Sequence, residues 1–374
     1  MHDLRVSSLE RACLENLSSS RNVEGEKRTV GQAVIEDRLL SLLYTRGEDG
    51  LNELRDRAKE IASILGTEKA FEKLNQIIGA LLATQPVKVL NSSRATAQAL
   101  GEPYDSGRLD LFSVLLAQLK QKSFPLRPTK TTSAEAFSNF SFFEAYFSNY
   151  IEGTVFLVEE AREIVYEGHD IPLRVQDSHD IRGTYQIVGN RKVMSITPQT
   201  AHEFVQLLRA LHAVILGGRP EKNPGAFKTR KTRADDTVFV APQFVLGTLK
   251  QGFAMMASLD DPLARAIYMM FLVSEVHPFD DGNGRIARIM MNAELVHGGS
   301  SKIIIPTVYR DDYMLALRRL TRQKDASVFV RMMERAAAFS HWLEPVDWEG
   351  MNTQLKKANA YKESDQDGAV LRWS

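Results

Sequence analysis

The hydrophobic positions of this chain recur mostly at three- and four-residue spacing, with polar residues between them. Residues 33–44, 51–65 and 68–83 show the pattern clearly and carry their charges on the opposite face. Such periodicity predicts amphipathic helices. It returns in TPQTAHEFVQLLRALHAVIL, where we expect Thr197 to cap a helix with Pro198 at its first position. The chain is therefore predicted to be mainly α.

One segment departs from the helical pattern. Residues 224–242, PGAFKTRKTRADDTVFVAP, place β-branched and aromatic residues on both sides of a polar centre at Ala234-Asp235-Asp236. This arrangement predicts a small β-hairpin. The basic run KTRKTR at 228–233 could touch nucleic acid, but a solvated face of the hairpin is the interpretation that we favour.

The pattern also suggests how the chain is divided. We expect a helical N-terminal region over residues 1–175, a second domain over 176–346 and a polar C-terminal tail over 347–374. A Pro- and Thr-containing connection, residues 125–139, lies within the first region. The tail is polar enough that we expect it to be partly disordered.

Composition narrows the class of protein. The 374 residues are 44% hydrophobic and 25% charged, and Lys plus Arg equals Asp plus Glu at 47 each, which gives no support to a generic binder of nucleic acid or anionic membranes. The single cysteine, Cys13, fits a reducing, intracellular setting. The longest apolar run, residues 266–273, is too short to span a bilayer, and the first residues lack the apolar stretch of a signal peptide. We therefore predict a cytoplasmic protein without a membrane span.

The densest polar chemistry lies in HPFDDGNGRIAR, residues 277–288, directly before an apolar helix. Gly282 and Gly284 flank Asn283 and tolerate the positive φ that curls backbone N–H groups into a concave nest. The helix that we expect to begin near Arg285 adds its positive end to the same place. Together these features predict an anion site.

Four charged or titratable side chains surround that predicted anion site. Arg285 and Arg288 lie three apart on one helix face, which suits a ligand with more than one phosphate. Asp281 is placed to hold Mg²⁺, which typically takes only one or two protein carboxylates. His277, with an ordinary pKa of about 6.5, can accept a proton from an attacking hydroxyl. The stretch therefore combines a base, a metal ligand, an anion nest and an arginine clamp.

Residues 277–288 match every fixed position of HPFx[D/E]GN[G/K]RxxR, the motif of the Fic (Fido) family, and the chain resembles that family over roughly residues 180–345. The resemblance implies a helical Fic core with a small β-hairpin flap. It also implies a protein adenylyltransferase that uses ATP and Mg²⁺. Such an enzyme transfers AMP to a Ser, Thr or Tyr hydroxyl of a target protein and releases pyrophosphate.

The resemblance gives each motif residue a role in this reaction. His277 would deprotonate the target hydroxyl, and Asp281 would hold Mg²⁺. Phosphate contacts would come from the rest of the motif, namely the nest at Gly282 and Gly284, Asn283 at the α-phosphate, Arg285 at the β-phosphate and Arg288 at the γ-phosphate.

The predicted hairpin lies where Fic proteins have their flap. By resemblance, it would pair with a target segment as an added strand, a mode of binding that reads the backbone more than the side chains. We expect Thr237, Val238 and Phe239 to form the contacting edge.

A second motif lies earlier in the chain. SNYIEG, from Ser148 to Gly153, matches the Fic inhibitory pattern [S/T]xxxE[G/N], and it would belong to an inhibitory helix near residues 141–153. Ser148 and Glu152 are one helical turn apart and share a face. By resemblance, Glu152 would pair with Arg288 and so occupy the partner of the γ-phosphate.

Rival interpretations stay open at this point. A Fic-type enzyme could remove AMP or transfer another phosphate-containing group, and a noncatalytic protein could use the same site only to sense ATP. No P-loop sequence is present, and a homodimer through helical surfaces is compatible with the pattern. The other histidines lack metal-ligand spacing and are predicted to be structural, namely His169, His179, His202, His212 and His297.

Overall fold

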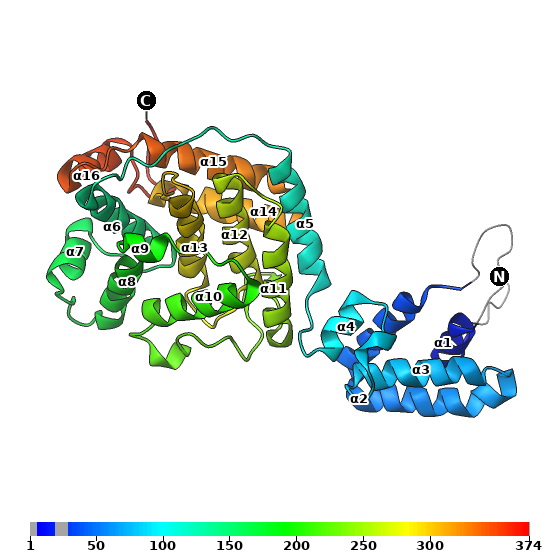
Figure 1. The fold of residues 1–374 in the computed structure, drawn as a ribbon. Coiled ribbons are helices and arrows are strands. Elements are labelled where there is room, and N and C mark those ends of the chain that lie inside the picture. Colours follow the sequence, from blue (N-terminus) through cyan, green and yellow to red (C-terminus); the bar gives the residue numbers. More distant parts are fainter. Residues whose placement is uncertain (1–5, 19–28, 374) are drawn as a thin grey trace. The chain divides into compact units, whose positions relative to one another are not determined.

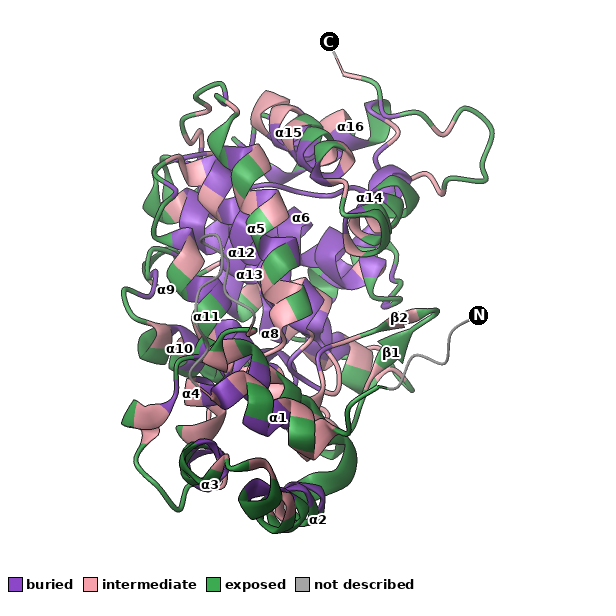
Figure 2. Ribbon diagram, turned by 90° about the vertical axis from the view of Figure 1, so that its right-hand side faces the viewer, coloured by how far each residue is buried: buried purple, intermediate pink, exposed green. Residues whose placement is uncertain are grey.

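The computed structural model describes residues 6–18 and 29–373, and its contacts divide the chain into two compact units, residues 1–104 and 105–374. Helices dominate both units (Figure 1), and the described residues contain one two-stranded antiparallel hairpin (Figure 2). The expected mainly helical fold with a small hairpin is therefore confirmed. Among the described residues, no helix is both long enough and apolar enough to cross a membrane.

The first unit is built around one long, broken helix. Its helices are α1 (Leu9–Leu17), α2 (Gln32–Leu65), α3 (Glu68–Leu81) and α4 (Ser93–Ala99). Gly47 interrupts α2 with φ 68° and ψ −168°, a conformation that glycine adopts far more readily than other residues. The two helices predicted over 33–44 and 51–65 therefore form the two arms of α2. Their buried faces meet α1 and α3 in a core that includes Leu14, Leu39 and Leu74.

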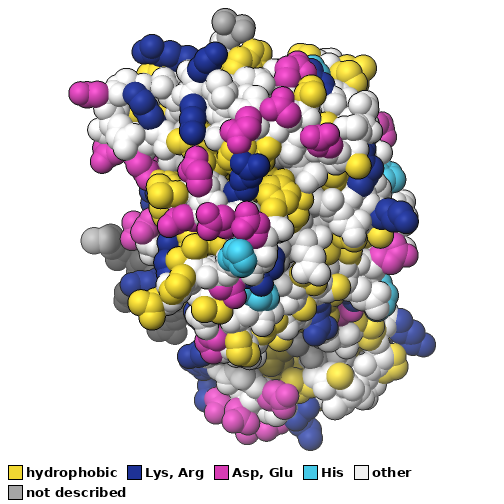
Figure 3. Space-filling model, turned by 90° about the vertical axis from the view of Figure 1, so that its left-hand side faces the viewer, with side chains coloured by type: hydrophobic (Ala, Val, Ile, Leu, Met, Phe, Trp, Pro, Cys, Tyr) yellow, Lys and Arg dark blue, Asp and Glu magenta, His cyan; other side chains and the backbone are white. Residues whose placement is uncertain are grey.

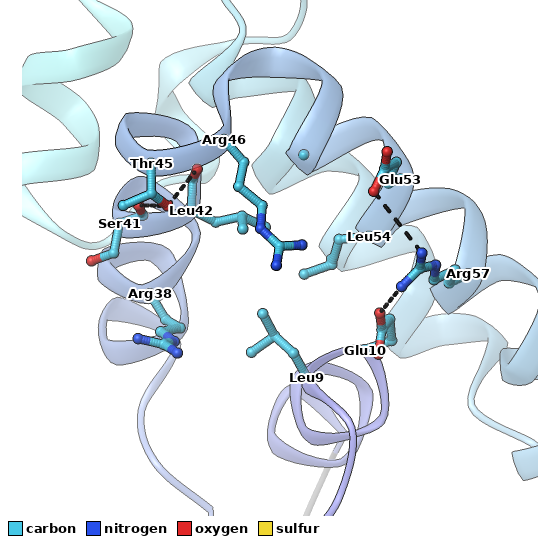
Figure 4. Close-up of a pocket in the computed structure, with 11 residues that line it drawn as sticks. Leu9, Glu10, Arg38, Ser41, Leu42, Thr45, Arg46, Glu53, Leu54 and Arg57 are labelled. Atoms are coloured by element: carbon cyan, nitrogen blue, oxygen red, sulfur yellow. Dashed lines mark hydrogen bonds and ion pairs between the residues drawn. The ribbon is translucent and has the colours of Figure 1, made fainter.

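A pocket of about 430 Å³ opens between α1 and the two arms of α2 (Figure 4). Leu9, Leu42 and Leu54 contribute apolar surface to it. On one side Arg57 lies 3.6 Å from Glu10, and the same arginine also approaches Glu53. The residues that line this pocket belong to the first unit, so it is separate from the motif at 277–288.

The second unit carries the motif. Its helices are α5 (Ser106–Lys120), α6 (Ala134–Ile151), α7 (Val158–Arg162), α8 (Val175–Val188), α9 (Arg191–Met194), α10 (Ala201–Ile215), α11 (Val245–Met256), α12 (Pro262–Val276), α13 (Asn283–His297), α14 (Arg310–Gln323), α15 (Ala326–Trp342) and α16 (Trp348–Lys357). The hairpin consists of β1 (Arg233–Ala234) and β2 (Thr237–Val238), with Arg233 opposite Val238. Residues 105–175, which we grouped with the N-terminal region, pack within this unit.

Helices α12 and α13 form the centre of the second unit, where they pack against each other and are almost wholly buried (Figure 2). Asp261 caps α12, because its carboxylate accepts from the N–H groups of Leu263 and Ala264 at 2.9 Å each. Pro262 follows at the first helical position, where its missing N–H has no consequence. The helix that leads into the loop between α12 and α13 is therefore capped at its start and buried along its length.

Helix α6 packs against α8 and α13. Ser133 caps it by accepting from the Ala136 N–H at 3.0 Å. The helix is buried on nearly all sides, as expected for a helix surrounded by other elements. It ends at Ile151, and Gly153 leaves it with φ +89°. Glu152 is thereby placed at the very end of α6.

Two local expectations differ from the structure. Thr200, not Thr197, caps α10, because the Thr200 hydroxyl accepts from the Glu203 N–H at 3.1 Å. Residues 347–374 are not simply a polar tail, because they contain α16 and contribute to the core of the second unit. The apolar members of α16 recur at three- and four-residue spacing, which buries one helix face. They are Trp348, Met351 and Leu355.

Candidate active site

His277 lies at the end of α12 in the left-handed region, with φ 51° and ψ 61°. Its N–H donates to the Val273 carbonyl at 3.1 Å, which closes the last turn of the helix. Residues other than glycine adopt this conformation only a few per cent of the time, and histidine is among the side chains that tolerate it better. The backbone therefore changes direction at His277 and begins the motif loop there.

The motif loop is closed by the side chain of Asn283. Its amide accepts from the Phe279 N–H and donates to the Phe279 carbonyl, both at 2.9 Å. The Phe279 ring is fully buried and stacks on His212, with centroids 3.6 Å apart. His212 accepts from the Gly225 N–H through Nδ1, so Nε2 carries the proton and donates to the Asp281 carbonyl at 3.0 Å. Asn283 and His212 thus hold the shape of the loop.

The His277 imidazole faces the hairpin, where it stacks on Phe239 with ring centroids 3.8 Å apart. Burial, followed by the nearby ammonium of Lys228, lowers the pKa of His277 to about 4. A hydrogen bond from the ring to the Ser274 carbonyl acts in the opposite direction. In the neutral imidazole the second ring nitrogen is then an acceptor. At neutral pH His277 is therefore in the form that can accept a proton.

The first turn of α13 offers backbone N–H groups that have no acceptor within the helix. Gly282 precedes it with φ +72°, and a Cβ there would lie 2.7 Å from a methyl group of Leu216. Gly284 lies directly beside the Glu152 carboxylate. A negatively charged group therefore already lies at the positive end of α13.

Arg288 is buried and binds α6 through three contacts. Its Nη2 lies 2.7 Å from Glu152 Oε1 and donates to the Ser148 carbonyl at 2.8 Å. Its Nε donates to the Ser148 hydroxyl at 3.0 Å. The Tyr313 hydroxyl on α14 adds a further hydrogen bond. Ser148 and Glu152 of α6 therefore both contact Arg288 of α13.

Arg285 points elsewhere. Its Nη1 lies 2.7 Å from Asp180 Oδ2 on α8, and these side chains are only 3% and 1% exposed. Its Nη2 lies 3.7 Å from Asp281 Oδ1. Asp281 is 38% exposed, and its Oδ1 also accepts from the Gly282 N–H at 2.6 Å. Arg285 therefore lies between two carboxylates.

His277 and Arg288 line the same pocket, which has a volume of about 250 Å³. Glu152 and Gly284 contribute to its wall from the α6 and α13 side. The hairpin and α14 supply the opposite side, including Phe239. The pocket is thus open to a ligand that reaches from the imidazole to the guanidinium of Arg288.

Hydrogen bonds from Arg322 and Arg108 hold the hairpin beside this pocket. The Thr237 hydroxyl accepts from Arg322 Nε at 3.2 Å and Nη2 at 3.1 Å. Arg108 on α5 donates to the Val238 carbonyl and forms an ion pair with Glu275 on α12. The Val238 side chain is exposed. Of the three residues that we expected at the flap edge, Thr237 and Phe239 therefore line the pocket, whereas Val238 does not.

Six of the twelve predicted site residues line one pocket, and two residues that we did not predict contact the site. Glu152, His277, Gly284 and Arg288 meet in one pocket, whereas Asn283 is engaged by Phe279 and Arg285 by Asp180. Asp180 and Tyr313 were missed. Tyr313 lies on α14, after the motif, and Asp180 belongs to no motif, so nothing in their spacing pointed to either residue.

The surface charge agrees with the neutral composition. On the face shown in Figure 3, lysines and arginines lie interspersed with acidic side chains. Within residues 6–18 and 29–373, no three His, Cys, Asp or Glu side chains converge as a metal site would require. A magnesium ion that shares its ligands with phosphates needs only one carboxylate from the protein, so the donor set at Asp281 fits it.

The comparison with family models agrees with the motif. Residues 203–295 match the model of the Fic/DOC family. The matched residues run from α10 to α13 and include the hairpin and the motif loop.

Curated relatives are distant. Protein adenylyltransferase fic-1 of Caenorhabditis briggsae is 26% identical over 204 residues, which are 52% of this chain and 39% of that protein. Protein adenylyltransferase Fic of Nematostella vectensis is 25% identical over 246 residues, which are 64% and 54% of the two chains. The matches thus span less than two thirds of the length of these relatives. A solved structure of Fic-1 from C. elegans aligns over 87% of this chain and 93% of its own, with 19% identity and a TM-score of 0.48.

Proposed function

We propose that this chain is a cytoplasmic protein adenylyltransferase that transfers AMP from ATP to a Ser, Thr or Tyr hydroxyl of a target protein. The observation that carries the proposal is that His277 and Arg288 line one pocket at the start of α13. A nucleotide in that pocket would have a base at one end and a guanidinium at the other. The matched family model and the distant adenylyltransferase relatives support the same reaction.

The proposed reaction needs one proton acceptor. The target hydroxyl oxygen would attack the α-phosphorus of ATP, and the bond from that phosphorus to the oxygen that bridges to the β-phosphorus would break, releasing pyrophosphate. The hydroxyl proton would pass to the neutral imidazole of His277, whose low pKa keeps it unprotonated at neutral pH. The N–H groups at the start of α13 would stabilise negative charge on the phosphates.

Two side chains would complete the nucleotide site. Asp281 would hold Mg²⁺, because its carboxylate is partly exposed beside the start of α13. Mg²⁺ supplies positive charge that neutralises the phosphates when it is bound. Arg288 would bind the γ-phosphate once Glu152 has left it.

We include autoinhibition in the proposal, on the basis of a polar ladder between α6 and α13. Glu144 on α6 accepts from Asn292 on α13 at 2.8 Å, and one turn later Ser148 accepts from Arg288 at 3.0 Å. One further turn along α6, Glu152 pairs with Arg288. As the residue number rises along α6, the partner on α13 falls from Asn292 to Arg288. These hydrogen bonds therefore fix how the two helices are aligned, and that alignment places Glu152 at Arg288. A carboxylate there would compete with the γ-phosphate and repel it.

The hairpin would receive the target. Residues 233–238 form a strand pair beside His277, and an extended target segment added to it would bring a hydroxyl toward the imidazole. Thr237, Val238 and Phe239 are the proposed contacts. Because Arg108 already binds the Val238 carbonyl, the target would have to use the remaining edge groups or displace Arg108.

Mass spectrometry of transfer tests the proposal. The Glu152→Gly chain is incubated with ATP, Mg²⁺ and a cell lysate, and proteins are searched for an added AMP on Ser, Thr or Tyr. We expect more adducts than with the wild-type chain and none with Glu152→Gly combined with His277→Ala. Absence of adducts from the Glu152→Gly chain would contradict AMP transfer and favour an ATP-sensing protein. Loss of AMP from a premodified target would instead favour AMP removal.

A further inference from the structure

Arg285 has an environment that does not match a phosphate ligand. Its guanidinium is buried and lies between Asp180 at 2.7 Å and Asp281 at 3.7 Å. Asn149 adds an amide oxygen at 3.4 Å from Nη1. In the described part of the chain, Arg285 is not among the residues that line the pocket of His277 and Arg288. Its positive charge is thus directed at two carboxylates of the protein.

The two carboxylates differ in ways that suggest different tasks. Asp180 is buried, and its Oδ2 also binds Arg219 Nε at 2.9 Å, so it is fixed between two guanidinium groups. Asp281 is partly exposed, accepts one close hydrogen bond from the Gly282 N–H, and has the Lys222 ammonium 4.0 Å from its Oδ2. Asp180 therefore takes the closer contact with Arg285, and Asp281 is left within the field of Arg285 without a close ion pair.

We infer that Asp180 is a positioning residue for the proposed magnesium site, and that it acts through Arg285. Asp180 holds Arg285 close enough to orient the Asp281 carboxylate but keeps it from forming a tight ion pair with that carboxylate. Asp281 thereby stays available to a magnesium ion that arrives with the nucleotide. The inference rests on the proposed function, and it gives Arg285 a task other than the β-phosphate contact that the family resemblance implies.

The inference predicts a specific effect of removing the charge of Asp180. When Asp180 loses its charge, Asp281 becomes the nearest carboxylate to Arg285 among the described residues. An Arg285–Asp281 ion pair would then compete with Mg²⁺ for the same oxygens. Loss of a residue that supports a metal ligand typically weakens metal affinity by about 10- to 100-fold.

Calorimetric ATP binding tests this, with each variant measured once with saturating Mg²⁺ and once with excess EDTA. All variants are made in the Glu152→Gly chain. Asp180→Asn is expected to weaken ATP binding about tenfold or more with Mg²⁺ and to leave binding in EDTA unchanged. Asp177→Asn is the matched control, because Asp177 lies one turn earlier on α8 and binds Arg219 at 2.7 Å but not Arg285. Asp180→Glu, which keeps the charge, is expected to restore much of the Mg²⁺-dependent affinity.

A double variant separates this role from a phosphate contact and from misfolding. Asp180→Asn with Arg285→Gln removes both buried partners, which is less disruptive than leaving one charge unpaired. We expect it to recover Mg²⁺-dependent ATP binding relative to Asp180→Asn alone, because the Arg285 guanidinium no longer competes for Asp281. If Arg285 binds phosphate, the double variant will bind ATP more weakly still.

Three results would overturn the inference. They are a further loss of affinity in the double variant, an equal loss with Mg²⁺ and with EDTA in Asp180→Asn, and a parent chain whose ATP binding does not depend on Mg²⁺. None of them bears on AMP transfer itself, which the adduct search measures separately.

Discussion

Glu152 and Gly284 face each other so closely that a Cβ on residue 284 would collide with the Glu152 carboxylate. A side chain at residue 284 would force the Glu152 carboxylate to move from its place over the first turn of α13. That turn carries the positive end of the helix dipole, so it attracts the Glu152 carboxylate just as it would attract a phosphate. Glu152 therefore pairs with Arg288 and lies beside the helix start, the two parts of the predicted anion site.

Replacing Glu152 by glutamine should tighten ATP binding. The variant keeps the size of the side chain but removes the charge that pairs with Arg288, and a hydrogen bond to a charged group contributes about 1.5–3 kcal/mol. We expect at least about a tenfold gain in ATP affinity, measured by calorimetry, since about 1.4 kcal/mol corresponds to that factor. Glu135→Gln, an exposed glutamate on the same helix, should leave the affinity unchanged. Equal affinities for wild type and Glu152→Gln would remove Glu152 from the nucleotide site.

Removing the Phe239 ring should raise the pKa of His277. In the wild-type chain, burial is the main cause that lowers this pKa to about 4, and Phe239 covers one face of the imidazole. In Phe239→Ala water reaches that face, so the pKa should move toward the ordinary value of about 6.5. An NMR titration of the His277 ring measures the shift directly, and Val238→Ala, at the exposed neighbour, is the control.

The same shift predicts a difference in pH dependence. A base works only in its unprotonated form, which for wild-type His277 persists as the pH falls from 7 to about 5. Transfer by the Phe239→Ala variant should instead decline in that range, because its imidazole becomes protonated nearer pH 6.5. A variant whose acid limb coincides with that of wild type would show that Phe239 does not set this pKa.

The motif residues could be placed from the sequence because twelve neighbouring positions define their own geometry. Gly282 supplies the positive φ, α13 starts immediately after it, and His277 ends the helix before it. Contacts within such a loop follow from local backbone rules. The pairing of Glu152 with Arg288 could be predicted only through the family resemblance, since the two residues come from different helices.

The remaining differences arise from tertiary packing. Nothing local links Asp180 to Arg285, because their contact depends on how α8 packs beside α13. An asparagine in a motif can bind either a ligand or its own loop, and the closeness of Phe279 decided that Asn283 closes the loop. The last residues looked polar in composition, but Met351 and Leu355 lie on one helix face, which packing buries.

The buried pair of Glu144 and Lys302 should be essential for the stability of the second unit. Lys302 Nζ lies 2.6 Å from Glu144 Oε2, and both side chains are almost completely buried. Burial raises the pKa of Glu144 and lowers that of Lys302, so each charge depends on the other. Lys302→Met leaves a buried carboxylate without its cation, which should cost about 3–5 kcal/mol in free energy of unfolding.

Tryptophan fluorescence during urea unfolding measures this cost, because all three tryptophans, Trp342, Trp348 and Trp373, belong to the second unit. Combining Lys302→Met with Glu144→Gln removes both charges and should recover most of the stability. A single variant as stable as the wild-type chain would show that the pair is not needed.

Arg108 should control how firmly the hairpin is held. It donates to the Val238 carbonyl and pairs with Glu275, whose pKa is raised by burial. Arg108→Met removes a charged hydrogen bond to the hairpin, a loss of about 1.5–3 kcal/mol, so the locally open state should become at least about tenfold more populated. Because residues 228–233 offer several trypsin sites, cleavage there should accelerate by a similar factor.

Timed trypsin digestion followed by peptide mass spectrometry measures this rate at the hairpin alone. Lys120→Met is the matched control, because Lys120 is an exposed basic residue on the same helix as Arg108. Cleavage of both variants at the wild-type rate would mean that the Arg322 contacts with Thr237 suffice to hold the hairpin. Faster cleavage in Arg108→Met alone would show that α5 helps to hold the hairpin in place for a target. Arg108 on α5 connects the Val238 carbonyl to Glu275, on the helix that ends at His277.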